Sequence, residues 1–537
     1  MKLIADASAE KLRGGFYTPE PIAEFILRWG INGSKDFDIL EPSCGDGVFL
    51  EQLKKHKFKY NSITAIEFDE IEAQKADKID LKNKQIINDD FHTYCNNTLQ
   101  KFDLIIGNPP YIRYQFFDRN QQIEAGDIFI KAGLKYSKLT NAWVSFVIGS
   151  SLLLKDKGGK IGFVLPAEIL QVSYAQQLRM FLAHFYNKIN IISFEKLVFP
   201  NIQQEVVLLL CEKNNSKEHN IDHIELKDAS ELEKLDFTRL KSPKKRIDFK
   251  SNKWTFYFLE QEEIDFLETI AEKRKIPTIG KYAKVEVGIT TGSNDFFTVP
   301  LTTVEQFDLH HYAKPMVGRS VQVNSVIFND KDWENNKFSK AKSHLLVFPK
   351  KQDLDPLNGA VKYIAEGEVL GIHKGYKTGI REDWFVVPSL KISDALFIRR
   401  NNLYPRLIIN EAKAFTTDTM HRVFLRPGTK LNAFTASYYN SLSLAFTEVS
   451  GRSHGGGVLE MMPNETERVL LPYDVKNEDL LLLIDEKIRN KTNIEEIVKI
   501  TNEIILKQNY GLTDEEIEIA HRIWKKLSKR RLGRGKK

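Results

Sequence analysis

Short apolar segments recur between residues 37 and 210, separated by helical stretches, and they restrict this chain to few folds. Their nearly continuous content of Ile, Val and Leu is typical of strands that are covered on both faces. The pattern therefore predicts a doubly wound α/β sheet, in which ligands bind beyond the carboxyl ends of the strands. The expected strands are Phe37–Leu40, Ser62–Ile66, Gln85–Ile87, Leu104–Ile106, Lys160–Leu165, Ile189–Phe194 and Val206–Leu210.

Length and composition indicate a globular protein of more than one domain. At 537 residues the chain is too long for one ordinary domain, so two or three are expected. No apolar run approaches the ~20 residues of a membrane span, and the N-terminus lacks the apolar core of a secretory signal. Only Cys44, Cys95 and Cys211 are present, widely spaced, which argues for a reducing cytoplasm and against a zinc site or a disulfide framework.

The formal net charge of +6 comes from the C-terminal end of the chain. Because the rest is near neutral, bulk charge does not identify a nucleic-acid partner, and a basic DNA-facing surface would require segregation of charge within the fold. The basic end fits a solvated, disordered tail as well as a phosphate-contacting one. Its basic residues are Lys525, Lys526, Lys529, Arg530, Arg531, Arg534, Lys536 and Lys537.

A glycine-rich loop follows the first expected strand. It reads Glu41-Pro42-Ser43-Cys44-Gly45-Asp46-Gly47 and opens into a helix. Gly45 and Gly47 would allow a tight turn and a close approach of the backbone to a ligand. About twenty residues on, Glu67 ends the next strand, at the position expected to bind ribose hydroxyls. Alone, such a loop is weak evidence for a cofactor site.

The tetrapeptide Asn108-Pro109-Pro110-Tyr111 follows the fourth expected strand. Two consecutive prolines make a rigid corner with no N–H to donate, so its carbonyls stay free as acceptors. An amide side chain and an aromatic ring flank this corner, which suits an exocyclic amine: acceptors take its hydrogens and the ring stacks on the base. Double prolines also simply end strands.

Taken together and in this order, the two motifs resemble those of S-adenosylmethionine-dependent DNA adenine methyltransferases. The family's loop reads Asp-Pro-Ala-Cys-Gly-Ser-Gly, so Glu41, Ser43 and Asp46 are departures. Glu41 preserves the acid, whereas Asp46 leaves open whether its side chain contacts the ligand. The resemblance implies a Rossmann-like, seven-stranded class I methyltransferase sheet with S-adenosyl-L-methionine as cofactor and no metal. It assigns cofactor binding to Glu41, Ser43, Gly45, Gly47, Glu67 and Asn108.

The resemblance, which covers roughly residues 14–212, implies further cofactor-binding residues. Thr18, in the segment Gly15-Phe16-Tyr17-Thr18-Pro19 before a helix, would hold the methionine carboxylate, partly through the helix N-terminus. Asp90 and Phe91 look like the segment that binds the cofactor adenine, and Phe146 like the aromatic that lines its pocket. Without the family, Asp90 could be a turn residue and Phe146 a core residue.

The same resemblance implies a mechanism. The Asn108 side-chain oxygen and the Pro109 carbonyl would accept the hydrogens of adenine N6 and aim its lone pair at the sulfonium methyl. Since a base inside a duplex cannot reach such a pocket, the target must be flipped out. Tyr111 and Phe199, the latter in Phe199-Pro200-Asn201-Ile202, would sandwich it. Phe199 could also be a buried loop anchor.

The second half of the chain differs from the first. We expect a catalytic domain over residues 1–240, a mixed α+β target-recognition domain over 241–475 and a C-terminal helical segment with a basic tail over 476–537. The charged stretch 217–253 is interpreted as an inter-domain connection. Segments Val287–Phe297, Thr417–Arg422 and Ser453–Glu460 resemble parts of the recognition domains of TaqI- and Eco57I-like enzymes. Basic and aromatic residues interleave at 374–377 and 381–384, where they could contact phosphates and base edges or form a solvated surface.

The order of motifs is similar to the γ arrangement of DNA adenine-N6 methyltransferases. It implies a site-specific enzyme that acts on double-stranded DNA and is functionally paired with a separate restriction endonuclease, as a cytoplasmic monomer of bacterial or phage origin. Alternatives are methylation of cytosine N4, of RNA adenine or of a protein glutamine, and a DNA-binding specificity module with a degenerate catalytic domain. Intact Asn108 and Tyr111 speak against the last alternative.

Overall fold

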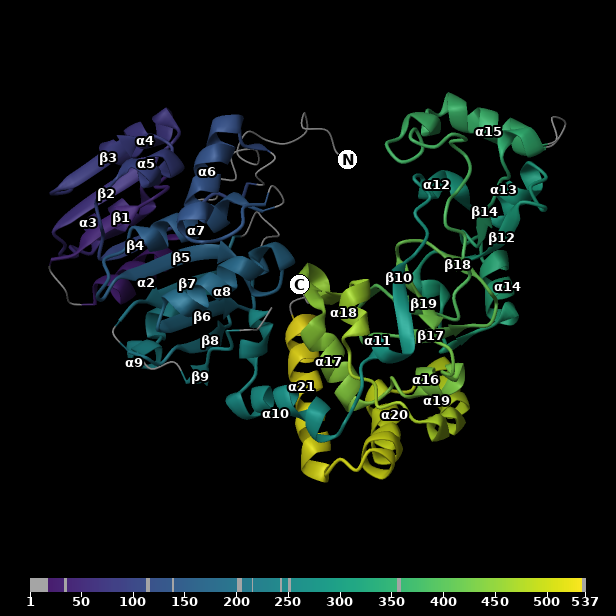
Figure 1. The fold of residues 1–537 in the computed structure, drawn as a ribbon. Helices are drawn as coiled ribbons and strands as arrows, with labels where there is room; N and C mark the ends of the chain where they lie inside the picture. The colour runs from purple at the N-terminus through teal and green to yellow at the C-terminus, as the bar shows by residue number, and fades with distance from the viewer. Residues whose placement is uncertain are drawn as a thin grey trace. The chain divides into compact units, whose positions relative to one another are not determined.

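The computed structural model describes residues 18–32, 36–112, 116–137, 140–199, 205–214, 216–241, 244–249, 253–354 and 359–533. The chain forms two compact units, residues 1–264 and 265–537, which divide within helix α10 (Gln261–Lys273). Each unit has its own sheets (Figure 1). Each also has its own hydrophobic core. None of the described helices has the length and apolar character needed to span a bilayer.

The first unit is built on one sheet, for which the described residues give nine strands in the order β3-β2-β1-β4-β5-β7-β6-β8-β9. Strands β1 to β5 run parallel, and β7 is antiparallel to both β5 and β6. All seven predicted strands are present, so the expected class I methyltransferase sheet is confirmed. The strands are β1 (Asp38–Glu41), β2 (Ser62–Glu67), β3 (Lys84–Asn88), β4 (Leu104–Gly107), β5 (Lys160–Pro166), β6 (Lys188–Phe194), β7 (Val206–Glu212), β8 (Asn220–Leu226) and β9 (Lys245–Arg246).

Strands β8 and β9 correct one expectation, because they lie within the charged stretch 217–253 that was interpreted as a connection. Two polar side chains of β8 are buried, and each has a partner. Asp222 forms an ion pair of 3.2 Å with Lys245 of β9, and His223 Nε2 lies 2.9 Å from the Ser193 hydroxyl of β6. These long-range contacts, which sequence patterning does not reveal, allow a polar segment to extend the sheet.

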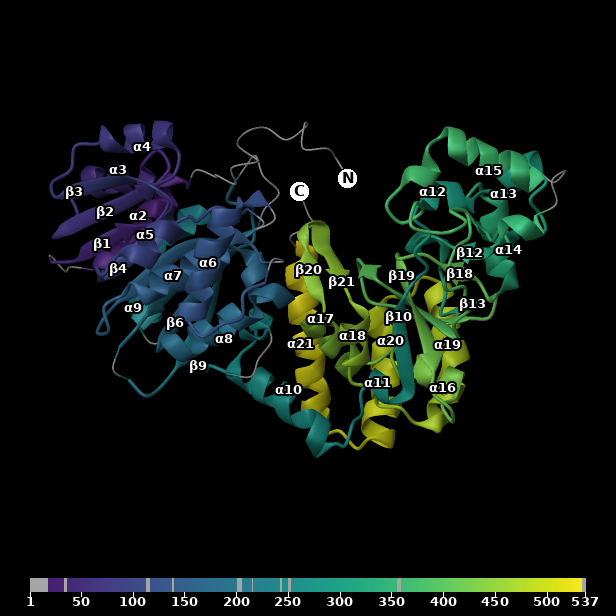
Figure 2. The same cartoon turned by 45° about the horizontal axis from the view of Figure 1, so that its top comes forward.

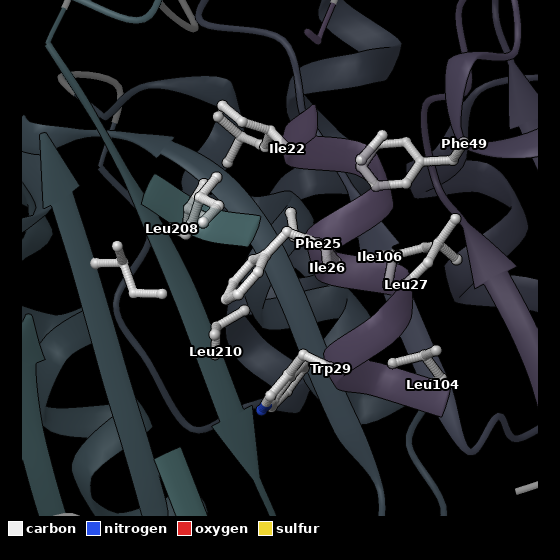
Figure 3. Close-up of a cluster of buried hydrophobic side chains, with 14 of the residues drawn as sticks. Ile22, Phe25, Ile26, Leu27, Trp29, Phe49, Leu104, Ile106, Leu208 and Leu210 are labelled. Atoms are coloured by element: carbon white, nitrogen blue, oxygen red, sulfur yellow. The ribbon is translucent and has the colours of Figure 1, made fainter. Parts of the chain in front are cut away.

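Helices cover the sheet in two groups. Helix α2 (Glu20–Ile31) contacts α3 (Val48–Lys55), β4 and β5, and its Phe25 and Leu27 share a buried cluster with Ile106 and Leu208 (Figure 3). A Cβ at Gly162 of β5 would lie 2.7 Å from Ile26 Cγ2, so glycine permits this close approach. Helices α5 (Phe91–Asn97), α6 (Arg119–Lys131) and α7 (Ala142–Leu152) contact one another, and α7 contacts β5. The other α-helices among the described residues of this unit are α4 (Glu70–Asp77), α8 (Gln176–Phe185) and α9 (Phe237–Lys241).

The second unit combines short strands with helices. Its described strands form sheets in the orders β10-β19-β15-β17-β13, β11-β14-β12-β18 and β16-β21-β20. The strands are β10 (Ala283–Val287), β11 (Thr298–Val299), β12 (Ala313–Val317), β13 (Ile327–Phe328), β14 (His344–Leu346), β15 (Ala395–Ile398), β16 (Arg400–Asn401), β17 (Leu407–Asn410), β18 (Phe415–Thr416), β19 (Met420–Leu425), β20 (Arg452–His454) and β21 (Val458–Glu460). The helices are α11 (Ile279–Tyr282), α12 (Asn294–Phe297), α13 (Leu301–Gln306), α14 (Asp330–Phe338), α15 (Gly359–Val369), α16 (Leu431–Ala436), α17 (Ser441–Ser450), α18 (Pro463–Glu467), α19 (Leu481–Arg489), α20 (Ile494–Thr501) and α21 (Asp514–Gly533).

The last helix, α21, packs along α17 (Figure 2). A capping box begins this helix, because Thr513 N donates to Glu516 Oε2 over 2.9 Å and Glu516 N donates to Thr513 Oγ1 over 3.2 Å. Much of the basic C-terminal end belongs to this helix instead of a disordered tail, and Arg531 is buried in an ion pair of 2.7 Å with Glu448 of α17. Residues 534–537 lie outside the described residues.

Candidate active site

A cavity of about 420 Å³ lies in the first unit, beside the carboxyl ends of β1, β2 and β4. Residues from segments far apart in the sequence line it, as expected for a parallel sheet whose strand ends converge. Most residues predicted to bind the cofactor meet here: Thr18, Glu41, Ser43, Gly45, Glu67, Asp90, Phe91, Asn108 and Phe146. Gly15–Tyr17, which precede Thr18 in the predicted motif, lie outside the described residues.

The glycine-rich loop is fixed by the strand next to it. Cys44 N donates to the Ile66 carbonyl over 2.9 Å, and Gly45 N donates to Glu67 Oε2 over 2.8 Å. Gly47 does not line the cavity. It begins α3 with φ +97°, and a Cβ there would lie 2.6 Å from Ile79 Cδ1, so its role is the tight turn and the packing of α3 on α4.

Carboxyl groups dominate the polar wall of the cavity: Glu41, Asp46, Glu67, Asp69, Glu72, Asp89 and Asp90. Burial raises the pKa of Glu41 well above its usual range, and the nearby carboxylates of Glu67 and Asp46 raise it further. Burial also raises the pKa of Glu67 and of Asp46. Glu41 Oε2 is buried and has no hydrogen-bond partner among the described residues. A cationic ligand would satisfy this carboxylate and lower the electrostatic cost of the cluster.

Aromatic rings form another part of the cavity wall. The rings of Phe91 and Phe146 stack with their centroids 4.7 Å apart, and the His92 ring meets Phe146 edge-on at 4.9 Å. Phe117 also lines the cavity and lies edge-on to His92 at 5.8 Å. A flat heterocycle fits such a wall, because aromatic rings favour stacked and edge-on contacts.

Asp90 is held by a network that the sequence reasoning missed. It begins α5 and accepts from the backbone N–H of His92 over 2.7 Å, while His92 Nδ1 lies 2.9 Å from the same oxygen. Gln121 Nε2 of α6 donates to the other oxygen over 3.1 Å, and His92 Nε2 lies 2.7 Å from the Ser145 hydroxyl. Burial alone would raise the pKa of Asp90, but the hydrogen bonds and charge of His92 outweigh burial and lower it.

The double-proline corner lies at the end of β4, with Asn108 and Pro110 on the cavity wall. The Tyr111 hydroxyl lies 2.8 Å from Asn108 Oδ1 and 3.1 Å from the Val164 carbonyl. The Ser43 hydroxyl donates to the Asn108 carbonyl over 3.3 Å, which joins the glycine-rich loop to this corner. Burial raises the pKa of Tyr111, so its hydroxyl stays a hydrogen-bond donor at neutral pH.

The remaining predicted residues, Pro109, Tyr111 and Phe199, do not line this cavity. Phe199 is buried in the hydrophobic cluster of α2, and Tyr111 packs against that same cluster. Pro200, Asn201 and Ile202, which follow Phe199 in the predicted motif, lie outside the described residues. The two aromatic residues predicted to sandwich a base therefore share one cluster close to the corner.

Two of the predicted recognition segments lie side by side in the second unit. Ile289 N donates to the Thr416 carbonyl over 2.7 Å, and a Cβ at Gly288 would overlap the Thr417 carbonyl oxygen at 1.8 Å. The third segment forms the β20–β21 hairpin, and His421 Nε2 lies 2.7 Å from the carbonyl of Met461, next to that hairpin.

Two family models match this chain. Residues 26–199 match the family described as Eco57I restriction-modification methylase, and residues 251–506 match the C-terminal domain of Type II methyltransferase M.Eco57I. S-adenosyl-L-methionine is the methyl donor of methylases with this class I fold, in agreement with the expected cofactor.

Relatives include Type II methyltransferase M.AccI of Acinetobacter calcoaceticus, 25% identical over 474 residues that cover 85% of this chain and 84% of that protein. Type II methyltransferase M.HincII of Haemophilus influenzae is 32% identical over 222 residues, 41% of this chain and 40% of that protein. Among solved structures, the type IIG restriction endonuclease BpuSI aligns with a TM-score of 0.41 and 13% identity, over 98% of this chain and 67% of that one. By its two family matches, the chain belongs to the Eco57I family of restriction–modification methylases.

Proposed function

We propose that this methylase transfers a methyl group to adenine N6 in double-stranded DNA, at a specific short site. The observation that carries the proposal is the position of Asn108. This residue lines the cavity together with the carboxyl groups and aromatic rings, and its carbonyl accepts a hydrogen bond from Ser43 of the glycine-rich loop. An amide and a proline carbonyl beside a methyl-donor pocket supply the two acceptors that an exocyclic amine requires.

The cofactor fits the residues of the cavity. S-adenosyl-L-methionine carries positive charge on its sulfonium and ammonium groups, and it supplies an activated methyl group when bound. The unpartnered Glu41 carboxylate suits the ammonium group, and Glu67 suits the ribose hydroxyls. Phe91 and Phe146 would stack against the adenine ring of the cofactor. Asp90 would accept a hydrogen bond from the amine of that ring. Thr18 would bind the methionine carboxylate.

Catalysis by this site is chiefly positioning. Adenine N6 is a weak nucleophile because its lone pair is delocalised into the ring. Asn108 Oδ1 and the Pro109 carbonyl would accept its two hydrogens, favour tetrahedral geometry and direct the lone pair at the methyl carbon. The new N–C bond forms as the S–C bond breaks, and the surplus N6 proton leaves to solvent. Asn108 Oδ1 would become available to the substrate amine when the Tyr111 hydroxyl turns from it to the Val164 carbonyl, which also lies within hydrogen-bond distance.

The target base must leave the duplex to reach this corner. Unpairing and unstacking the base costs a few kcal/mol, and each aromatic ring that stacks on the flipped base stabilises it by ~1–3 kcal/mol. Tyr111 and Phe199 are the proposed stacking partners. Since both pack against one hydrophobic cluster, the base would enter at its edge.

The second half of the chain, residues 241–475, is proposed to read the DNA site, with residues 476–537 as its helical support. A separate restriction endonuclease that cleaves the same unmethylated site is the proposed functional partner of a monomeric methylase. The predicted cytoplasmic location belongs to this proposal as well. N4 of cytosine is the alternative target, since it presents a similar amine, although that activity usually accompanies Ser in place of Asn108.

The test combines purified protein, labelled S-adenosyl-L-methionine and unmethylated bacterial duplex DNA, followed by digestion and identification of the labelled nucleoside. We expect N6-methyladenine with the unaltered protein and none with Asn108→Ala, which should lose at least about 100-fold in kcat while still binding the cofactor. Detection of N4-methylcytosine would identify cytosine, instead of adenine, as the target base. Absence of label in DNA, together with label in parallel reactions that contain bacterial RNA or protein instead, would overturn the proposal.

A further inference from the structure

A loop in the second unit projects an aromatic ring between two lysines. Residues 371–381, here named the tip loop, follow α15, and Tyr376 within it is 86% exposed. Lys374 and Lys377 are exposed on either side. Among the residues that the structure describes, these three side chains have no hydrogen bond, ion pair or ring contact. A tyrosine as exposed as this one leaves the apolar faces of its ring in contact with water. A ligand that covers the ring would remove that contact.

The tip loop is rigid in spite of its exposure. Thr378 is buried beneath it, and its hydroxyl lies within hydrogen-bond distance of the carbonyls of Ile372 (2.5 Å) and Gly375 (3.1 Å). Gly379 N donates to the Gly375 carbonyl over 2.7 Å. A Cβ at Gly375 would lie 2.8 Å from the Thr378 hydroxyl, so the turn closes tightly around that side chain. The loop's own bonds therefore fix the backbone that carries Tyr376.

The C-terminal side of the tip loop is anchored in the unit. Arg381 donates to the Thr291 carbonyl over 2.7 Å, and its guanidinium lies 5.9 Å from the centre of the Phe297 ring. Trp384, just beyond, is buried in the core, and its indole N–H donates to Glu368 of α15 over 3.2 Å. Arg381 thus connects the tip loop to the predicted recognition segment 287–297.

We propose that the tip loop is a DNA-contacting element, with Lys374 and Lys377 on phosphates and Tyr376 against a base or sugar. This inference rests on the proposed function. Two unpaired ammonium groups suit the polyanionic backbone, where contacts release counterions. An aromatic side chain held on a rigid turn offers stacking or apolar contact at little entropic cost. The arrangement combines positioning contacts with a contact that can sense the base.

The main competing occupant is another protein. Val369, Leu370 and Ile380 are also exposed near the tip loop, and such apolar side chains suit a protein surface. The charge of the tip favours DNA, however. Between residues 371 and 381 the sequence contains no Asp or Glu, and the first acid, Glu382, follows Arg381 at the anchored end.

The test measures binding of the full chain to fluorescently labelled, sheared unmethylated bacterial duplex DNA over a salt titration, with cofactor present. A plot of log affinity against log salt concentration has a negative slope. We expect the double variant Lys374→Ala/Lys377→Ala to make this slope shallower by about two, one for each lost phosphate contact. Lys499→Ala, which removes an exposed lysine from α20, is the matched control and should leave the slope unchanged.

Tyr376→Ala tests the second part of the inference. We expect about a tenfold loss of affinity with an unchanged salt slope, and relaxed sequence preference when the methylated sites are mapped by sequencing. Phe338→Ala, at another exposed aromatic residue, should do neither. If the unaltered protein methylates DNA but the tip-loop variants match it in affinity and slope, the inference is wrong, the proposed function stands, and a protein partner becomes the occupant. If the unaltered protein neither binds nor methylates DNA, both fail.

Discussion

The Tyr111 hydroxyl lies within hydrogen-bond distance of two acceptors, Asn108 Oδ1 at 2.8 Å and the Val164 carbonyl at 3.1 Å. It has one hydrogen and can satisfy only one of them at a time. The first acceptor is the oxygen proposed to bind adenine N6, whereas the second belongs to β5. Tyr111 can therefore hold the Asn108 amide in place in the free protein and transfer its hydrogen bond to Val164 when the substrate amine arrives.

Tyr111→Phe keeps the ring and removes the hydroxyl. We expect kcat to fall about fivefold, because one neutral hydrogen bond that orients the Asn108 amide contributes ~1 kcal/mol. Affinity for the cofactor should not change. Tyr111→Ala also removes the ring and should lower kcat further. Steady-state kinetics with DNA as the varied substrate measure both, and an unchanged kcat in Tyr111→Phe would mean that the hydroxyl does not position the amide.

Glu41→Gln replaces a buried carboxylate by a neutral side chain of similar shape. Loss of a charge-assisted contact of ~1.5–3 kcal/mol predicts roughly 10- to 100-fold weaker binding of the cofactor. The free protein should become more stable by ~1–3 kcal/mol at neutral pH, since the variant has no carboxyl group that must be either buried as a charge or protonated on folding. Calorimetric titration and thermal unfolding check the two expectations, with Glu51→Gln on the exposed face of α3 as the control.

The pH dependence of that stability follows from the raised pKa of Glu41. A carboxyl whose pKa is higher in the folded state than in the unfolded state loses stability as pH rises from its unfolded pKa towards its folded pKa. The difference in Tm between Glu41→Gln and the unaltered protein should therefore vanish in acid, below the ordinary pKa of Glu, and grow as pH rises. A difference that shrinks with rising pH would contradict this assignment.

Gln121→Ala removes the side chain that donates to Asp90 Oδ2. Asp90 would keep its hydrogen bonds to His92 but lose the one from Gln121. Because one such hydrogen bond contributes ~1 kcal/mol, we expect the cofactor to bind about fivefold more weakly. The kcat at saturating cofactor should not change. Gln121→Glu should bind the cofactor more weakly still, because a second carboxylate would face Asp90. Gln74→Ala on α4, where the amide donates to Glu70 over 3.3 Å, is the control. An unchanged dissociation constant in both Gln121 variants would exclude a positioning role.

The contrast between Glu67 and Gln121 shows what the sequence can reveal. Glu67 ends a strand, about twenty residues after a glycine-rich loop, and this spacing within one βαβ unit predicts its position. Gln121 reaches Asp90 across 31 residues, from a helix whose pattern carries no sign of the contact. Strand β8 was missed for the same reason, since burial of its Asp222 depends on Lys245. Local sequence patterns thus predict strands and loops, whereas polar contacts between distant segments can be identified only from the three-dimensional structure.

The buried ion pair between Glu448 and Arg531 gives a last prediction, on stability. Both side chains are 2% exposed, and Arg531 also donates to the carbonyls of Asn402 and Gly457. Arg531→Met would leave Glu448 buried without its partner, which costs ~3–5 kcal/mol. Because burial would then raise the pKa of Glu448 further, the loss should be larger at alkaline pH than in acid, where the carboxyl is protonated.

The double variant Glu448→Leu/Arg531→Met separates the charge from the packing. Replacing both partners by apolar side chains is often neutral or stabilising, so we expect most of the lost stability to return and its pH dependence to disappear. The carbonyl of Gly457 in the β20–β21 hairpin would still lack its donor, so DNA binding should stay weaker than in the unaltered protein even after stability is restored. Thermal unfolding across pH and DNA binding at one salt concentration test this. Recovery of both together would mean that Arg531 acts on the hairpin only through the stability of the unit.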